Sequence, residues 1–336
     1  MRWELDTTVS VTEPIGADPQ QQAVMDLVSG HNLVVGLAGS GKTTTLIASV
    51  AQRLREGVSP SEVLVLTYGK SAVRDFREEL AGHVQSTVLP YIGTFHALAY
   101  SIVMGAAALG AETQAQELPR LLSGAEEDAR IRDLIAGLLS DTQGPGALIQ
   151  WPKWLRSAAT TDSFAREVRT VIARLKELNQ SGSDLIALGQ KCKRPEWVVA
   201  GHIASNDAEV MALENVLDYN SLLLAAIALA PESPVVSRIS HIYIDEYQEV
   251  GPLHRQLLAV LAQRASVLVA VGNPHESVFG FRGSETDMSS GFYVEFPRAT
   301  SHELTGAWRF GREIATAATA PFDRDRQALV GYGNFP

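Results

Sequence analysis

The stretch Asn32-Leu-Val-Val-Gly-Leu-Ala-Gly-Ser-Gly-Lys-Thr43 decides the fold of this chain. Residues 32–36 predict a buried strand, residues 36–43 fit the pattern G-x-x-x-x-G-K-[ST] without a mismatch, and a helix is predicted over residues 42–55. A glycine-rich turn that opens a helix directs backbone N–H groups at phosphate oxygens. The sequence therefore predicts a nucleoside triphosphate bound by Gly36, Ala38, Gly39, Ser40, Gly41, Lys42, Thr43 and Thr44.

A pair of acids supplies the remaining chemistry. A strand predicted over residues 239–244 runs directly into Asp245-Glu246-Tyr247-Gln248. Lys42 is predicted to reach the β- and γ-phosphates, while the Thr43 hydroxyl and Asp245 hold Mg²⁺. Glu246 suits the general base that deprotonates the attacking water. Two adjacent acids favour hydrolysis over transfer to a small acceptor, so the pattern indicates a motor ATPase that uses ATP and Mg²⁺.

The rest of the chain predicts an α/β fold with an insertion. Further strands are expected at residues 63–67, 88–93 and 267–271, and helices at 70–81 and 252–263. Between about residues 100 and 216 the apolar residues recur only at helical spacing. Strands alternating with helices are typical of a parallel sheet. A P-loop parallel sheet interrupted by a helical insertion is the predicted fold.

Composition excludes several classes of protein. With 336 residues, 46% hydrophobic and 20% charged, the chain matches a folded protein of about two domains. A net charge of −10 argues against a protein that coats nucleic acid by bulk positive charge. Residues 151–194 nevertheless hold nine Lys/Arg against four Asp/Glu, which indicates either solvated helix faces or a binding surface.

Location is predicted from what the sequence lacks. The longest apolar stretch, residues 222–230, is well short of the ~20 residues that a bilayer requires. The first residues carry acids where a signal peptide would be apolar. Cys192 is the single cysteine, so no internal disulfide can form. A cytoplasmic protein with no membrane partner is expected.

Seven sequence blocks, in this order, resemble superfamily 1A DNA helicases of the UvrD/Rep type. Besides the two motifs above, they are Asp18-Pro-Gln-Gln-Gln22, Leu64-Val-Leu-Thr-Tyr-Gly-Lys-Ser-Ala72, Thr94-Phe-His-Ala-Leu-Ala-Tyr100, Val271-Gly-Asn-Pro-His-Glu-Ser-Val-Phe-Gly-Phe-Arg-Gly283 and Leu304-Thr-Gly-Ala-Trp-Arg-Phe-Gly-Arg-Glu-Ile-Ala315. The last block looks most similar to the F-box DNA helicase branch. The resemblance implies an ATP-dependent 3′-to-5′ DNA helicase or translocase acting on single-stranded DNA with a 3′-tailed duplex.

The resemblance also implies individual roles. Gln21 would read the adenine edge, Trp308 would stack on adenine, Gln248 would sense the nucleotide, and Arg309 would reach the γ-phosphate. Aromatic faces stack on bases without reading their sequence. The positions implied to contact single-stranded DNA are Thr67, Tyr68, Thr94, His96, Phe279 and Phe281.

The family fold implies four segments. Residues 1–100 and 217–298 would form a first RecA-like domain, residues 101–216 a helical insertion, and residues 299–336 the start of a second RecA-like domain. Motifs V and VI of the family have no counterpart before Pro336. Another chain supplying the second motor domain is therefore one expected partner.

Three positions depart from the family pattern. Glu276 stands where glutamine is usual, Asn273 where aspartate is usual, and Glu249 where aspartate is usual. A carboxylate at position 276 would repel the phosphates unless it is protonated, paired or turned away. A non-catalytic subunit that binds ATP and DNA, or an inactive helicase fragment, is therefore the alternative function. A P-loop kinase or small-molecule NTPase would leave the Thr94-Phe95-His96 block without a role.

Overall fold

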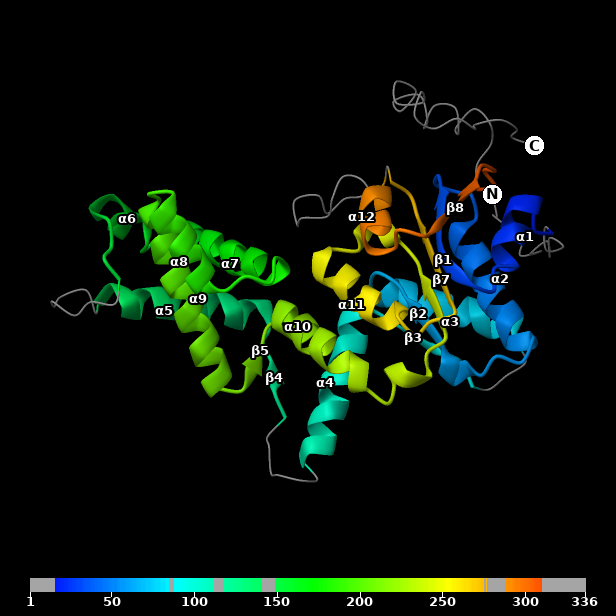
Figure 1. Cartoon of the computed structure of the whole chain (residues 1–336), viewed down its shortest axis with the longest axis horizontal. Helices are drawn as coiled ribbons and strands as arrows, with labels where there is room; N and C mark the ends of the chain where they lie inside the picture. The colour runs from blue at the N-terminus through cyan, green and yellow to red at the C-terminus, as the bar shows by residue number, and fades with distance from the viewer. Residues whose placement is uncertain are drawn as a thin grey trace, which may run out of the picture.

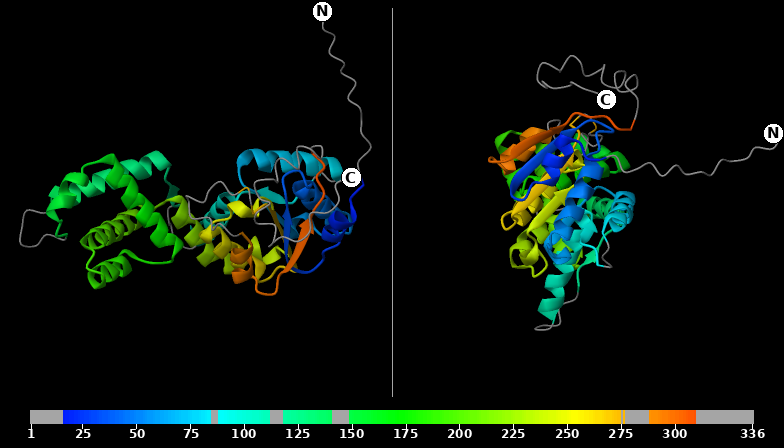
Figure 2. Two further views of the ribbon diagram at one scale, coloured as in Figure 1. Left: turned by 90° about the horizontal axis from the view of Figure 1, so that it is seen from above. Right: turned by 90° about the vertical axis from the view of Figure 1, so that its right-hand side faces the viewer.

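A computed structural model describes residues 16–84, 88–111, 118–140, 149–274, 276 and 288–309 of the chain. Within these residues, two lobes lie side by side along the long axis of the molecule (Figures 1 and 2). One lobe is an α/β sandwich and the other consists of helices. The predicted α/β class with a helical insertion is confirmed.

Six parallel strands of the described residues form the central sheet in the order β3-β2-β6-β7-β1-β8. These strands are β1 (Gly30–Gly36), β2 (Val63–Leu66), β3 (Tyr91–Gly93), β6 (His241–Ile244), β7 (Val267–Gly272) and β8 (Thr300–Leu304). Every strand is paired in parallel, so all carboxyl ends meet at one edge of the sheet. Loops that follow parallel strands at that edge are where open α/β sheets bind ligands.

Alternate residues of β1, β2, β6 and β7 supply two hydrophobic cores. On one face, Val34, Val65 and Tyr243 pack under α1 (Pro19–Met25), α2 (Lys42–Arg55) and α3 (Lys70–His83). On the other face, strand residues such as Leu33 and Ile244 pack under four further helices. These are α4 (Phe95–Ala111), α10 (Tyr219–Leu229), α11 (Pro252–Ala262) and α12 (Met288–Glu295). The sheet is covered on both faces, as strands of nearly continuous apolar residues require.

The strand β8 differs from the predicted division at residue 299. Its residues 300–304 pair with residues 32–36 of β1, so this strand belongs to the first sheet. Pairing over such a distance in sequence leaves no local signal. Residues 310–336, which hold most of the predicted second domain, lie outside the described residues.

The chain enters the helical lobe and returns to the α/β lobe at one place. It contains α5 (Gly124–Ser140), α6 (Lys153–Ala158), α7 (Asp162–Glu177), α8 (Gly182–Lys191) and α9 (Pro195–Leu213). The two-residue strands β4 (Arg120–Leu121) and β5 (Val216–Leu217) pair in parallel where the chain enters and leaves this lobe. These strands were not predicted, because two residues are too short for a periodic pattern.

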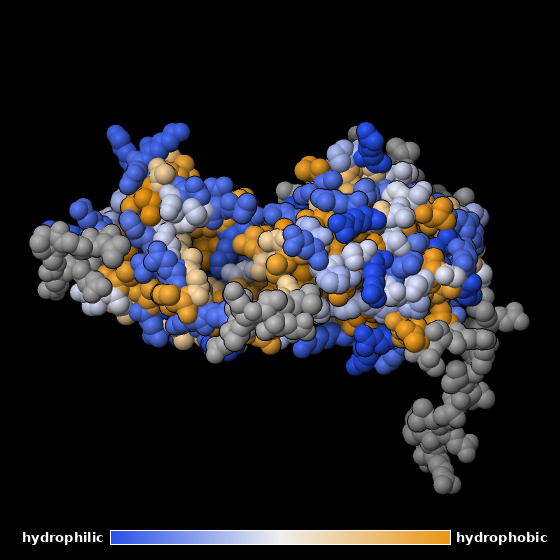
Figure 3. Space-filling model, turned by 60° about the horizontal axis from the view of Figure 1, so that its bottom comes forward, coloured by the Kyte–Doolittle hydropathy of each residue, from blue (hydrophilic) through white to orange (hydrophobic). Residues whose placement is uncertain are grey.

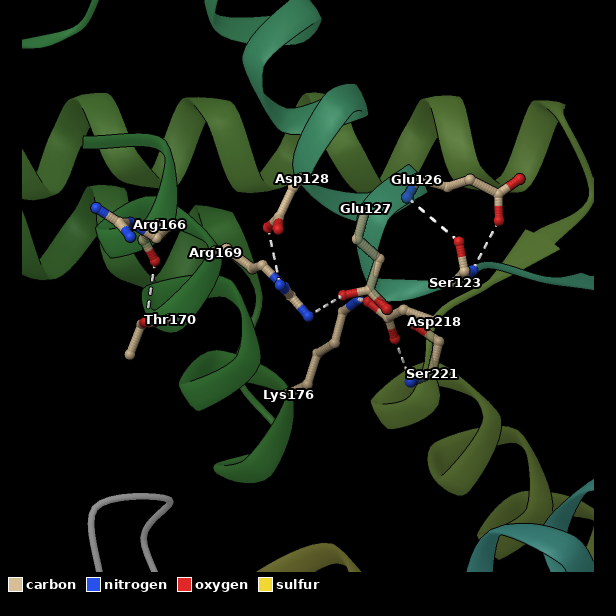
Figure 4. A network of polar contacts seen from close by, with 10 residues as sticks. All are labelled: Ser123, Glu126, Glu127, Asp128, Arg166, Arg169, Thr170, Lys176, Asp218 and Ser221. Atoms are coloured by element: carbon tan, nitrogen blue, oxygen red, sulfur yellow. Dashed lines mark hydrogen bonds and ion pairs between the residues drawn. The ribbon is translucent and has the colours of Figure 1, made fainter. Parts of the chain in front are cut away.

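Ion pairs hold this lobe together and to its neighbour. Arg169 of α7 reaches Glu127 and Asp128 of α5, each at 2.8 Å, and Lys176 of α7 pairs with Asp218, which caps α10 (Figure 4). A cavity of about 140 Å³ lies among these charges. Figure 3 shows a hollow between the lobes with hydrophobic residues exposed on its walls. No helix among the described residues is long and apolar enough to cross a bilayer.

Candidate functional site

The phosphate-binding turn lies between the end of β1 at Gly36 and the start of α2 at Lys42. Gly39 and Gly41 have φ angles of 78° and 81°, the left-handed region that favours glycine. A Cβ atom on Gly41 would lie 2.6 Å from the Gln21 amide nitrogen, so a larger residue could not occupy this position without displacing Gln21. Gly39 and Gly41 therefore permit the left-handed backbone of the turn, and Gly41 also leaves room for the Gln21 side chain.

Lys42 is buried at the base of this turn. Its Nζ donates to the Leu37 carbonyl at 2.9 Å. Burial lowers the pKa of Lys42, and the negative charges of Glu276, Glu246 and Asp245 partly offset that effect. A buried ammonium group that is hydrogen-bonded to its own loop and influenced by nearby negative charges can bind a phosphate.

Thr43 and Asp245 meet across the gap between α2 and β6. The Thr43 hydroxyl lies 3.0 Å from Oδ2 and 3.3 Å from Oδ1 of Asp245. Burial, followed by the charge of Glu246, raises the pKa of Asp245 to about 6. A nearby cation would relieve both effects, and hydroxyl and carboxylate oxygens are the donors that Mg²⁺ prefers. These two residues therefore fit a divalent cation, although no group of three or more His, Cys, Asp or Glu ligands occurs in the described part of the chain.

Glu246 and Gln248, which follow Asp245 in the chain, are hydrogen-bonded to each other. Glu246 has φ 55° and ψ 45°, a left-handed backbone that costs energy for a residue with a side chain. The Gln248 amide nitrogen donates to the Glu246 carboxylate, and its oxygen accepts from the Asn273 N–H at 3.0 Å. Gln248 thus connects the end of β6 with the end of β7.

Gln21 and Trp308 also contact the phosphate-binding turn. Gln21 Nε2 lies 3.4 Å from the Ser40 carbonyl, and Asp18 caps α1 and holds the Gln21 side chain in place. The Trp308 N–H donates to the Gly39 carbonyl at 2.8 Å, and the Trp308 side chain is 39% exposed. An amide and an exposed indole beside the same turn can contact a base by hydrogen bonding and stacking.

Gln20 and Thr305 were not predicted. The Gln20 Oε1 accepts from the Thr305 N–H at 2.9 Å and from its hydroxyl at 3.0 Å. This contact ties the end of β8 to α1 and so positions the segment that carries Trp308. The resemblance singled out one glutamine of three adjacent ones, and only the fold reveals that its neighbour has a different contact.

Arg309 and Glu276 both lie in the electrostatic field of Lys42. The positive charge of Arg309 lowers the pKa of Lys42, whereas the negative charge of Glu276 raises it. The Glu276 N–H donates to the Asn273 carbonyl at 3.2 Å, and the residue is exposed. Both residues therefore lie near the phosphate-binding turn.

Four of the six residues expected to contact DNA lie at or just after the ends of β2 and β3. Tyr68, Thr94 and His96 are partly exposed there. Thr67 differs, because its side chain is only 2% exposed and its N–H donates to the Gly93 carbonyl at 3.0 Å. Thr67 therefore supports Tyr68 and does not itself line the surface. Phe279 and Phe281 lie outside the described residues.

Comparisons with known proteins identify the relatives of this chain. The model of the UvrD/REP helicase N-terminal domain matches residues 17–297. The ATP-dependent DNA helicase PcrA of Leuconostoc citreum is 24% identical over 94% of this chain and 40% of its own length. DNA helicase IV of Escherichia coli K12 is 25% identical over 87% and 45%, and PcrA of Staphylococcus aureus Mu50 is 24% identical over 89% and 39%. The chain thus spans less than half the length of these relatives.

Proposed function

The chain belongs to the UvrD/REP helicase family, and we propose that it is the N-terminal motor portion of an ATP-dependent DNA helicase or translocase. It binds ATP at the turn between β1 and α2 and hydrolyses it in response to single-stranded DNA. The 3′-to-5′ direction, a 3′-tailed duplex substrate and a cytoplasmic location form part of this proposal, with the direction taken from the family resemblance alone.

One observation carries the proposal: Thr43 and Asp245, 202 residues apart, meet at 3.0 Å beside Lys42 and Glu246. Lys42 binds the γ-phosphate of ATP in place of the Leu37 carbonyl. Glu246, held by Gln248, accepts the proton of the water that attacks the γ-phosphate. Gln21 and Trp308 hold the adenine.

Thr43 and Asp245 would hold Mg²⁺, which neutralises charge on the β- and γ-phosphates when it is bound. Arg309 adds a second positive charge beside Lys42. Motion along DNA requires a second motor domain that closes on this site.

Single-stranded DNA lies across the carboxyl ends of β2 and β3. Tyr68, Thr94 and His96 offer rings and a hydroxyl there, and the family resemblance alone adds Phe279 and Phe281 to the proposed DNA contacts. Stacking of bases on aromatic rings is worth about 1–3 kcal/mol per base and tolerates any sequence. Such a surface suits a motor that moves along DNA without sequence preference.

Hydrolysis of ATP by the 336-residue chain, with and without oligothymidylate, tests this function. Lys42→Ala serves as the blank, because it removes a phosphate contact and keeps the backbone of the turn. Turnover that rises with DNA in the unchanged chain and is absent in the variant supports the proposal. Turnover retained in Lys42→Ala contradicts it.

Glu276 favours a second candidate, a non-catalytic subunit that binds ATP and DNA. Its carboxylate acts on Lys42, the same group that the γ-phosphate requires. ATP affinity without DNA-stimulated turnover, in a form that contains a second motor domain, would support this candidate. Recovery of turnover in Glu276→Gln would show that this carboxylate is what silences the site.

A further inference from the structure

His254 lies between the loop that follows Glu246 and the start of α4, and its ring contacts both. It lies in the first turn of α11, the helix that follows Asp245 and Glu246 by a short 3₁₀ turn. Its Nδ1 accepts from the Gly251 N–H at 3.3 Å. This bond joins the ring to the loop that leaves the ATP site.

The other side of the ring faces the start of α4. The His254 ring lies 5.0 Å from the ring of Phe95 and 5.0 Å from that of His96, at interplanar angles of 51° and 83°. Phe95 and His96 come from the block that follows β3. Such ring pairs contribute about 0.5–1.5 kcal/mol each beyond the area that they bury. A displacement of the loop would therefore also shift the ring that packs against His96.

Backbone hydrogen bonds connect the same regions by a second route. The Asp245 N–H donates to the Leu66 carbonyl at 2.9 Å, and the Thr67 N–H donates to the Gly93 carbonyl at 3.0 Å. The ends of β6, β2 and β3 are therefore fixed to one another. The contacts of His254 with Gly251 and His96 add a further connection between the segment after Asp245 and His96.

The protonation state of the ring favours a fixed contact. Burial, followed by the positive charge that His96 can carry, lowers the pKa of His254 to about 3, and burial lowers the pKa of His96 as well. Both rings are neutral near pH 7. Because Nδ1 of His254 accepts a backbone hydrogen bond, the ring proton lies on Nε2.

His96 extends the connection to the helical lobe. Its ring meets Tyr219 edge-on at 5.2 Å, and Tyr219 begins α10 directly after Asp218. Asp218 pairs with Lys176 of α7. In addition, Gln256 of α11 donates to the Glu177 carbonyl at the end of α7, at 3.3 Å. The helix that carries His254 thus contacts both lobes.

We propose that His254 is a positioning residue that couples the nucleotide site to the single-stranded DNA surface, by fixing the loop after Glu246 against His96. The inference rests on the proposed function, because it requires both ligands to bind. It assigns His254 no contact with ATP or DNA. Its effect lies in how strongly one ligand changes the affinity for the other.

The test is a double titration of the 336-residue chain. Affinity for fluorescein-labelled oligothymidylate is measured with and without β,γ-imido-ATP and Mg²⁺, and the ratio of the two dissociation constants is the coupling factor. Coupling between sites is commonly about 5- to 150-fold. The unchanged chain is expected to fall in this range, and His254→Ala to lie within about twofold of unity while each separate affinity stays within about threefold.

Two further variants keep the result interpretable. His254→Phe keeps a ring against Phe95 and His96 but removes the acceptor for Gly251, so it remains packed and is also expected to lose coupling. His31→Ala is the matched control, because the His31 ring packs on Phe296 at 4.6 Å near the amino ends of the strands. It should keep the coupling factor of the unchanged chain.

The outcomes separate the two proposals. An unchanged chain that binds neither β,γ-imido-ATP nor oligothymidylate overturns the proposed function, and this inference with it. Binding of both ligands without coupling overturns only the role of His254. Coupling retained in His254→Ala or in His254→Phe also overturns that role, and equal loss in His31→Ala would assign the effect to general loosening of the fold.

Discussion

The two lobes use charged residues in opposite ways. At the carboxyl edge of the sheet, burial lowers the pKa of Lys42 and raises that of Asp245, and the neighbouring Glu246 has a strained backbone. In the helical lobe, Arg130 and Arg169 meet carboxylates at 2.8–2.9 Å. We propose that the charges in the first region bind a ligand, whereas those in the second pair with one another.

This difference bears on the basic run at residues 151–194. Four of its nine cations, Arg169, Arg174, Lys176 and Arg194, pair with acids of the same chain. Arg194 also lies 5.2 Å from the ring centre of Trp197. Of the two explanations offered by the sequence, helix faces that serve the fold gain support over a continuous binding surface.

The largest expected effect is a loss of ATP hydrolysis at the sheet edge without a loss of stability. Glu246→Gln removes the proton acceptor but keeps a group of the same size beside Gln248, so hydrolysis should fall about 10²- to 10⁴-fold. Single-turnover hydrolysis and ATP affinity are the measurements. Affinity and melting temperature should match the unchanged chain, and hydrolysis within tenfold of it would contradict the role of Glu246.

The next largest expected effect is a loss of stability in the helical lobe without a loss of ATP hydrolysis. Arg130 and Asp207 lie 2.9 Å apart with side chains only 15% and 5% exposed. Arg130→Met leaves the Asp207 carboxylate buried without this partner, which should lower the free energy of unfolding by about 3–5 kcal/mol. Urea denaturation measures the loss. Adding Asp207→Leu should restore most of it, and a loss below about 1 kcal/mol would contradict the contrast between the lobes.

Asp245 tests the same comparison, because its buried, charged carboxylate should lower the free energy of unfolding when no cation is bound. Its pKa is raised from 3.8 to about 6, so the folded chain binds this proton more tightly than the unfolded chain. The free energy of unfolding should therefore rise as pH falls from about 6 towards 4.

Asp245→Asn removes that dependence. In chelator at pH 7 the variant should be more stable than the unchanged chain by up to about 3 kcal/mol, and the difference should vanish near pH 4. Urea denaturation across this pH range is the measurement. Greater stability of the unchanged chain at pH 7 would contradict the assignment.

The smallest expected effect concerns an ion pair whose cation is exposed. Arg174 lies 2.9 Å from Glu177 on α7, and its side chain is 53% exposed. Arg174→Ala should change the free energy of unfolding by no more than about 0.5 kcal/mol, because water screens such pairs. Paired with Arg130→Met in the same urea series, it shows whether burial sets the strength of the contacts. A loss above about 1.5 kcal/mol would show that it does not.

Much of the fold and part of the site could be predicted, for identifiable reasons. The helix after Lys42 and the strand at residue 63 were predicted within a residue of their observed ends, because glycine spacing and apolar runs are local signals. The pairing of β8 with β1 and the contact between Gln20 and Thr305 depend on residues far apart in sequence. The burial of Thr67 shows that a motif can name a strand end without telling which side chains face outwards.

The short parallel pair β4–β5 has a consequence for how the chain folds. Neighbouring strands lie about 4.8 Å apart, so the helical lobe begins and ends at almost the same point. Between these two strands, the described residues 122–140 and 149–215 contain a hydrophobic core of their own, centred on Ile135, Val168 and Ile203. Such a unit can open and close as an independent foldon, without breaking the pairing of β2 with β6 that the α/β lobe requires. Acquisition or loss of the whole helical lobe during evolution would leave the sheet register unchanged.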